Sequence, residues 1–239
     1  LNDISAALSK TVTWIIQCAP FGIMGLVYNT VSVNGLSTFT EYGKLLAVLL
    51  GSMLFIYFVT NPILVFWCIR KNPYPLIFKC LKKSAITAFF TRSSAANIPI
   101  NMEACEEMGL DKDTYSVTIP LGATINMDGT AIYQGVCAIF IASCYGIHLT
   151  LPQMMTIILT ATLASIGTAG VPGSGMVMLA MVLTSVGLPV DGIALVAGVD
   201  RIFDMGRTTV NITGDASCCI IVSNLERKKE ERRAKRGSC

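Results

Sequence analysis

The stretch LPQMMTIILTATLASIGTAGVPGSGMVMLAMVLTSVGL, Leu151–Leu188, has two apolar arms that flank a tip rich in Gly, Ser, Ala and Pro. Each arm has about 14 residues, which is roughly 21 Å as an α-helix and shorter than the ~30 Å hydrocarbon core of a bilayer. Non-helical backbone survives at membrane depth only where it is buried in protein or lines a cavity. The stretch therefore predicts a helical hairpin that enters the membrane and turns back.

A second stretch, residues 76–108, has the same plan, with the tip TRSSAANIP. Four longer apolar segments match the ~20 residues that a spanning helix needs: 11–31, 45–69, 115–145 and 193–225. The order is span, span, hairpin, span, hairpin, span, so the last four elements form two hairpin-plus-span units. Short, interrupted segments in matching positions of two halves are typical of the binding site of a secondary transporter.

The composition favours a polytopic membrane protein over a soluble enzyme or a nucleic-acid-binding protein. The chain of 239 residues is 53% hydrophobic and only 14% charged, with a mean hydropathy of +0.62, whereas soluble domains carry about 25% charged residues. Because the chain begins with Leu, we expect it to be a fragment that lacks earlier membrane segments.

Basic residues gather in two places, 70–83 and the tail 227–239, whereas the loop 32–43 has neither Lys nor Arg. The positive-inside rule then predicts a multi-pass protein of the cell (inner or plasma) membrane with a cytoplasmic C-terminal tail. The two hairpins approach from opposite faces in this topology. The predicted fold class is therefore an all-α polytopic membrane protein, with spanning helices and two re-entrant helical hairpins in an inverted repeat.

The last apolar segment carries the charged stretch VDRIFDMGRTTVNITGD, Val199–Asp215. On a helix, its polar residues fall within roughly 80° of one face: Asp200, Asp204, Arg207, Asn211 and Asp215. A lone charge at the bilayer centre costs about 2.5–3.5 kcal/mol, so this face must meet partners, water, ions or substrate. An internal salt-bridge network, for example Asp204 with Arg207, is the alternative. Three acids against one arginine leave an excess of negative charge, which favours cations.

The segment TINMDGT, Thr124–Thr130, places Asp128 in another span. Gly129 permits a local break in the helix, and a broken helix exposes carbonyl oxygens, which hard cations prefer. Asn126, Asp128, Asn211 and Asp215 are predicted to add side-chain oxygens to a sodium site. In the alternative interpretation, Gly129 is a packing residue and Asp128 is hydrogen-bonded.

The two hairpin tips differ in chemistry. At the first tip, the hydroxyls of Ser93 and Ser94, together with backbone amides, are suited to hold a substrate carboxylate. Arg92 lies beside them, and the alternative places it at the cytoplasmic interface. The second tip, with Gly170, Gly173 and Gly175, suits a flexible lid, and a plain tight turn is the alternative.

Together these motifs resemble the glutamate transporter family, the dicarboxylate/amino acid:cation symporters, of bacterial or archaeal type. The resemblance extends over residues 1–226 and rests on TRSSAANIP, NMDGT, SIGTAGVPGSG and DMGRTTVNITGD. It implies a homotrimer whose protomers have eight spans, of which this chain holds the last four with both hairpins. The implied organisation is a scaffold and trimerisation helix (1–32), a spanning helix (43–72), hairpin 1 (74–110), a broken span with NMDGT (113–146), hairpin 2 (150–188), a substrate-binding span (190–226) and a basic cytoplasmic tail (227–239).

The resemblance also implies roles for individual residues. Asp204 would hold the substrate's amino group and Arg207 a side-chain carboxylate. The implied substrate-binding residues are Arg92, Ser93, Ser94, Thr130, Gly170, Val171, Gly175, Asp204, Arg207, Thr208 and Asn211. The implied sodium ligands are Gly122, Thr124, Asn126, Met127, Asp128, Ser165, Ile166, Thr168, Asn211 and Asp215. Neither a catalytic residue nor an organic cofactor is expected, so the chain is predicted not to be an enzyme.

Two features bear on the substrate and on coupling. Residues 88–102, AFFTRSSAANIPINM, resemble the bacterial serine/threonine:sodium branch. Arg207 favours an acidic substrate, because a guanidinium matches a carboxylate bidentately and a neutral substrate would leave it buried and unpaired. Gln134 stands where animal members carry a glutamate linked to proton and potassium coupling, which argues against such coupling here.

The favoured function is therefore sodium-coupled symport of aspartate or glutamate by alternating access. The alternatives are a sodium-coupled symporter of serine, threonine or another small neutral amino acid, and a proton-coupled glutamate or dicarboxylate symporter. An intramembrane aspartyl protease would need a close pair of carboxylates, and its GxGD signature is missing. A channel is a further alternative, which the paired hairpins disfavour.

Overall fold

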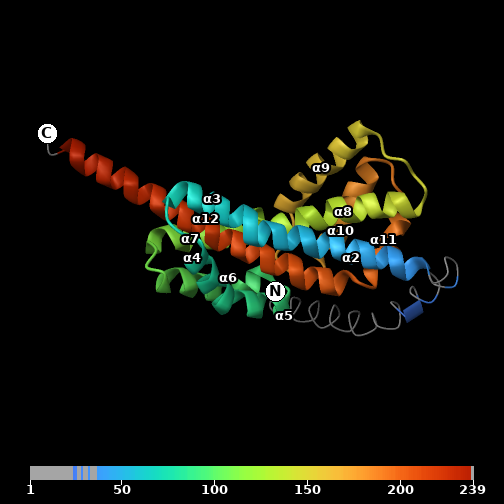
Figure 1. Cartoon of the computed structure of the whole chain (residues 1–239), viewed down its shortest axis with the longest axis horizontal. Coiled ribbons are helices and arrows are strands. Elements are labelled where there is room, and N and C mark those ends of the chain that lie inside the picture. Colours follow the sequence, from blue (N-terminus) through green and yellow to red (C-terminus); the bar gives the residue numbers. More distant parts are fainter. Residues whose placement is uncertain (1–23, 26–27, 29–31, 33–36, 238–239) are drawn as a thin grey trace, which may run out of the picture.

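The computed structural model describes residues 24–25, 28, 32 and 37–237, and every regular element within these residues is a helix. Figure 1 shows an elongated bundle in which α12 (Asp200–Gly237) runs along the length of the molecule. Most of the predicted scaffold helix (1–32) lies outside the described residues. Two of the described helices are long and apolar enough to cross a membrane, Thr40–Ile69 and Lys112–Cys144.

The first of these is one continuous helix made of α2 (Ser37–Phe55), the π-helical turn η1 (Ile56–Thr60) and α3 (Asn61–Ile69). It ends where Arg70 adopts a left-handed conformation with φ 60°. The helix therefore begins earlier than the predicted span 43–72 and stops before its end. Trp67 is 70% exposed and Phe66 50% exposed, as expected for side chains that face lipid.

Hairpin 1 has a rising arm of α4 (Tyr74–Cys80), η2 (Leu81–Ala85) and α5 (Ile86–Thr91), and a returning arm, α6 (Ser94–Glu107). Lys83 joins the two arms near their base, at 2.9 Å from Glu103 and in contact with Glu107. The predicted hairpin at 74–110 is thus a helical hairpin in the structure. Its re-entrant placement in a membrane stays a prediction.

The broken span consists of α7 (Lys112–Ile125) and α8 (Asp128–Cys144). Asp111 caps α7 by accepting the backbone N–H of Thr114 at 2.8 Å, which lowers the pKa of the Asp111 carboxyl. The helix breaks at Asn126 and Met127, whose ψ angles are 75° and 56°. The predicted break is therefore present, but it lies before Gly129 rather than at it.

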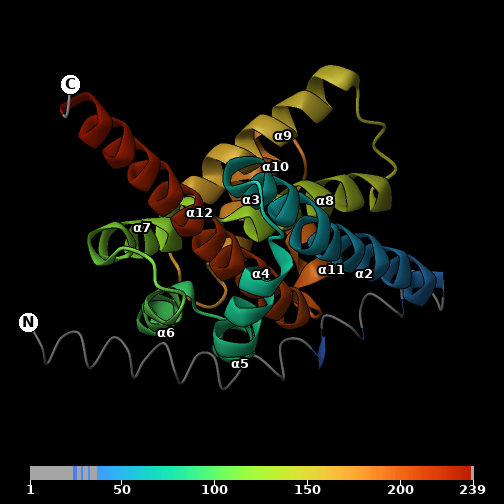
Figure 2. The ribbon, with the colours of Figure 1, turned by 60° about the vertical axis from the view of Figure 1, so that its left-hand side comes forward.

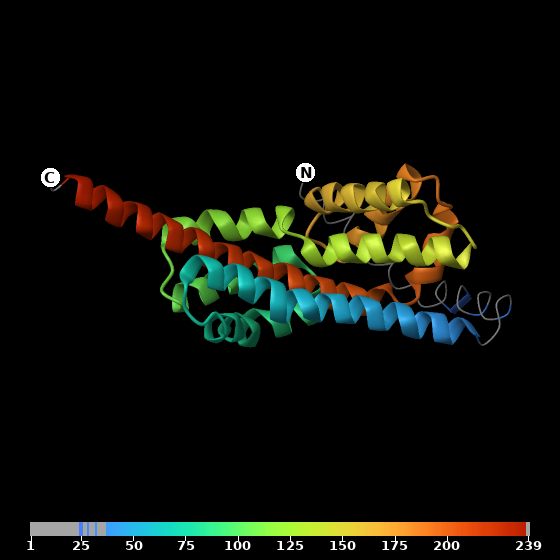
Figure 3. The ribbon, with the colours of Figure 1, turned by 45° about the horizontal axis from the view of Figure 1, so that its top comes forward.

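Hairpin 2 consists of α9 (Leu151–Ile166), a tip at 167–173 and α10 (Ser174–Ser185). The short helices η3 (Val190–Gly192) and α11 (Ile193–Ala197) then lead into α12. Figures 1 and 3 show that hairpins 1 and 2 lie toward opposite ends of α12. The inverted repeat itself stays a prediction.

Two hydrophobic clusters hold the helices together. The larger one joins α2, α8, α9, α10 and α12 through residues such as Leu49, Ile141 and Leu183. The smaller one joins α6, α7 and α12 through Cys105, Tyr115, Ile119 and Cys219. α12 is the only one of these helices that belongs to both clusters, and Figure 2 shows it passing between the two hairpins.

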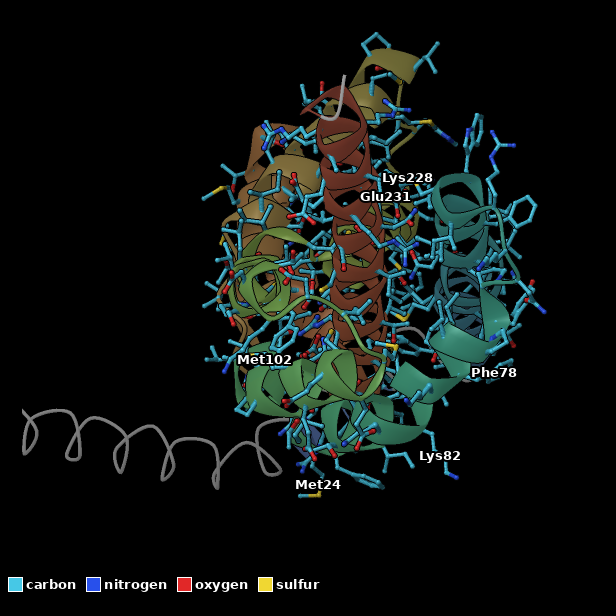
Figure 4. All side chains as sticks on the ribbon, turned by 90° about the vertical axis from the view of Figure 1, so that its left-hand side faces the viewer. Met24, Phe78, Lys82, Met102, Lys228 and Glu231 are labelled. Carbon is cyan, nitrogen blue, oxygen red and sulfur yellow. The ribbon has the colours of Figure 1, made fainter. Side chains whose placement is uncertain are left out.

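Residues 227–237 continue α12, which has 38 residues, so the helix runs past the predicted end of the last span at residue 226. That this segment is a cytoplasmic tail stays a prediction. Figure 4, seen from the C-terminal end of α12, shows Phe78 and Lys82 on the outside of the surrounding helices. The charges in the first half of α12 are largely turned toward the protein, with Asp204, Arg207 and Asp215 all buried, whereas the charged residues from Glu226 onward are mostly exposed.

Candidate substrate and sodium site

The tips of the two hairpins meet beside the first third of α12. The carbonyl oxygen of Gly170, in the tip of hairpin 2, accepts the Ser93 hydroxyl at 2.8 Å and the backbone N–H of Ala95 at 3.1 Å. A Cβ atom at Gly170 would lie 3.0 Å from Ala95 N and 3.1 Å from Ala123 O. Close approach of the two tips therefore depends on glycine at this position.

The tips, α8 and α12 enclose a cavity of about 10 Å³, which is room for about one water molecule. Nine of the predicted substrate-binding residues line it, namely Arg92, Ser94, Thr130, Gly170, Val171, Asp204, Arg207, Thr208 and Asn211. The other two lie beside it. Ser93 joins the tips, and Gly175 leaves space for the guanidinium of Arg207, whose Cζ would be 2.8 Å from a Cβ there.

A buried charge network borders this cavity. Arg207 donates from Nε to Asp204 at 2.9 Å and from Nη1 to Asp200 at 3.1 Å. Nη1 of Arg92 lies 3.7 Å from Asp204 Oδ2, which also accepts the backbone N–H of Gly173 at 3.1 Å. The internal salt bridge between Asp204 and Arg207 is thus present. The two arginines and two aspartates balance in charge.

Arg207 retains one donor for a ligand. Its Nη2 is buried and has no hydrogen-bond partner among the described residues. The guanidinium also stacks over the ring of Tyr133, with Cζ 4.4 Å from the ring centroid, a favourable cation–π contact.

Sequence reasoning missed several residues around the cavity. Asp200 precedes Arg207 by seven residues, or two helical turns, so the sequence placed Asp200 on the charged face. It did not show that Asp200 pairs with Arg207. Nothing in the sequence marked Tyr133 as a partner of Arg207. Ala169 and Ser174 line the cavity as well, and the hydroxyl of Ser174 donates to Ala169 O at 2.6 Å within the tip.

The helix break brings part of the predicted sodium set together. Asn126 Nδ2 donates to Asp215 Oδ1 at 3.0 Å, and Asn211 Oδ1 accepts the backbone N–H of Gly129 at 2.8 Å. A Cβ at Gly122 would lie 2.6 Å from Asp215 Oδ1. Four members of the set therefore lie together where the helix break meets α12, namely Gly122, Asn126, Asn211 and Asp215. The side chain of Asp128 lies close by, since its Oδ2 would be 3.4 Å from a Cβ at Gly214.

The rest of the predicted sodium set does not join this cluster, and its three hydroxyls donate to nearby backbone carbonyls. Thr124 is exposed and donates to Leu121 O at 2.9 Å. Ser165 and Thr168 are buried and donate to Thr162 O and Ala164 O, each at 2.8 Å. Ile166 is 44% exposed. Met127 is buried and lines the substrate cavity.

Gly129 has the packing role that was the alternative interpretation. A Cβ there would lie 2.6 Å from Arg207 O and 2.7 Å from Arg207 Cα. The backbones of α8 and α12 therefore cross in direct contact beside the cavity. Gln134, one turn further along α8, is fully buried, and neither of its side-chain polar atoms has a hydrogen-bond partner among the described residues.

The profile of the sodium:dicarboxylate symporter family matches residues 1–225. The chain is similar to proteins named serine/threonine transporter SstT. It is 45% identical over 219 residues to that of Bifidobacterium adolescentis, covering 90% of this chain and 51% of that protein. It is 46% identical over 221 residues to that of Streptococcus agalactiae, covering 90% and 54%. The chain thus spans about half the length of the curated relatives that it matches.

Proposed function

Since the chain belongs to the sodium:dicarboxylate symporter family, we propose that the protein carries serine and threonine across the membrane together with sodium. The observation that carries this proposal is the charge balance around Arg207. Its guanidinium is already paired with Asp200 and Asp204, so a substrate without a side-chain charge does not leave it unpaired. This pairing removes the reason for expecting an acidic substrate.

A hydroxy amino acid fits the remaining donors and acceptors. The substrate is a zwitterion without net charge, so it leaves the balance of two arginines and two aspartates unchanged. Asp204 takes the ammonium group. The free Nη2 of Arg207 donates to the hydroxyl oxygen, which is a neutral acceptor. The relatives named as serine/threonine transporters support the same substrate class.

The deciding experiment is uptake of radiolabelled L-serine by the full-length protein in liposomes with an inward sodium gradient. We expect unlabelled threonine to compete and aspartate not to compete. Uptake of aspartate in preference to serine would instead establish the second candidate, an acidic amino acid symporter, which the unpaired Nη2 of Arg207 favours.

Sodium coupling rests on the oxygens around Asp215. We expect Asp215→Asn to weaken sodium binding and serine binding together, each by roughly tenfold, because thermodynamic linkage between two ligands is reciprocal. Asparagine keeps the acceptor for Asn126 and removes only the charge. The measurement is serine affinity as a function of sodium concentration, and the matched control is Asp113→Asn at an exposed position.

A proton-coupled symporter would instead take up serine when a pH gradient is imposed without sodium. Gln134 cannot titrate at the buried position on α8. Serine uptake driven equally well by a pH gradient in the absence of sodium would therefore contradict sodium symport.

Entry of substrate requires the tips to separate, because the cavity has room for about one water molecule. We expect hairpin 2 to open, since its tip is held to hairpin 1 mainly through Gly170. A cysteine at Val171, which is 51% exposed, should react with a membrane-impermeant thiol reagent. Sodium with serine should slow the reaction, measured in a background whose native cysteines, including the nine of this chain, are replaced by serine. Equal rates with and without ligands would exclude this gate.

A further inference from the structure

The turn at the tip of hairpin 1 has an unusual backbone. Thr91 ends α5, Arg92 adopts a left-handed conformation with φ 54°, and the extended Ser93 caps α6 by accepting the N–H of Ala96 at 3.1 Å. A residue with a side chain is disfavoured in this conformation and keeps it only where the surrounding structure holds it.

Asn97, in the first turn of α6, stabilises this backbone conformation. Its Nδ2 donates to Thr91 Oγ1 at 2.8 Å and to Ser93 O at 2.8 Å, so its two bonds close around Arg92 from both sides. Asn97 is fully buried, and its Oδ1 has no hydrogen-bond partner among the described residues. Because a buried unpaired acceptor destabilises the fold, stability of α6 alone does not explain an asparagine at this position.

The turn places Arg92 in the substrate cavity. Arg92 lines the cavity and reaches Asp204 at 3.7 Å, whereas Asn97 does not line it. We infer that Asn97 is a positioning residue for substrate binding, which fixes the Arg92 turn and through it the carboxylate that receives the ammonium group. The identity of the ligand in this inference rests on the proposed function, whereas the role of Asn97 in fixing the Arg92 turn does not.

A double-mutant cycle on the full-length protein tests the inference. The probe is L-serine, bound at saturating sodium. We expect Asn97→Ala to weaken serine binding by roughly tenfold, the equivalent of two lost hydrogen bonds of ordinary strength. In the Arg92→Ala background, the same substitution should change the affinity by less than about twofold, because a residue that acts through Arg92 has nothing left to position.

Asn101 offers a matched control on the same helix. It is equally buried but donates to Ile212 O at 3.0 Å, away from the tip. Asn101→Ala should lower thermal stability and weaken serine binding equally with and without Arg92. If Asn97→Ala behaves in the same way, Asn97 is only a structural residue and the inference is wrong. If Asn97→Ala does not fold, Asn97→Thr, which keeps one donor, takes its place with a smaller expected loss.

A second measurement needs no ligand. Amide hydrogen exchange at Arg92 and Ala96 should be faster in Asn97→Ala than in Asn101→Ala. Unchanged exchange at both amides would also overturn the inference. If the wild type binds aspartate but not serine, the proposed substrate fails and the same cycle, run with aspartate, still decides the role of Asn97.

Discussion

Asp204→Asn is expected to lose serine binding, by about 30-fold to several thousandfold. Removing one partner of a buried charged contact costs about 2–5 kcal/mol, and every ~1.4 kcal/mol is a factor of ten in affinity. Asp204 is 3% exposed and meets Arg92, Arg207 and the backbone N–H of Gly173. Asparagine retains the shape and the acceptor for Gly173, but it removes the charge that pairs with Arg207 and faces the substrate ammonium.

The measurement is serine binding to the purified full-length protein at saturating sodium, with thermal unfolding as a check on folding. Asp191→Asn is the control, since Asp191 is exposed in η3 and should bind serine as the wild type does. An affinity for serine within threefold of the wild type in Asp204→Asn would remove Asp204 from the site.

Gly129→Ala is the second substitution with a large expected effect. The new Cβ would lie 2.6 Å from a backbone oxygen of α12, and backbone cannot move aside as a flexible side chain can. Overpacking of this kind typically costs about 1–3 kcal/mol. The helices must separate at Arg207, so serine affinity should fall together with the melting temperature.

Gly135→Ala, on the same helix, is the matched control for this prediction. A Cβ there meets no atom within 4 Å, and alanine favours a helix over glycine by up to ~1 kcal/mol. We therefore expect Gly135→Ala to be neutral or stabilising. A melting temperature for Gly129→Ala as high as for Gly135→Ala would contradict the close crossing of α8 and α12.

The sequence predicted the features that depend on local pattern. Arm length and tip composition indicated both hairpins, and helical periodicity placed Asp204, Arg207 and Asn211 on one face. The clustering of nine predicted substrate residues around one cavity follows from these features together with the family resemblance.

Features that depend on contacts between distant segments could not be predicted in this way. Helical periodicity does not show which carboxylates a long arginine side chain pairs with, so the ion pair between Arg207 and Asp200 was missed. Because Arg207 then lacked a second partner, an acidic substrate was favoured. The spacing around Gly129 does not show that a backbone 78 positions later in the chain lies against it. The continuation of α12 beyond residue 226 was missed because a run of charges was interpreted as a tail, although Lys, Arg and Glu all favour helix.

The unbroken course of α12 limits how this protein can diverge. One helix carries the charge network at Asp204 and Arg207, the polar cluster at Asn211 and Asp215, and Cys219 of the smaller core cluster. Each residue of a helix turns the chain by about 100°, so gaining or losing one codon between Arg207 and Asn211 would rotate one half of this set away from its partners. We therefore expect length changes in connections such as 146–150, whereas between Asp204 and Cys219 we expect α12 to vary by exchange of one residue for another.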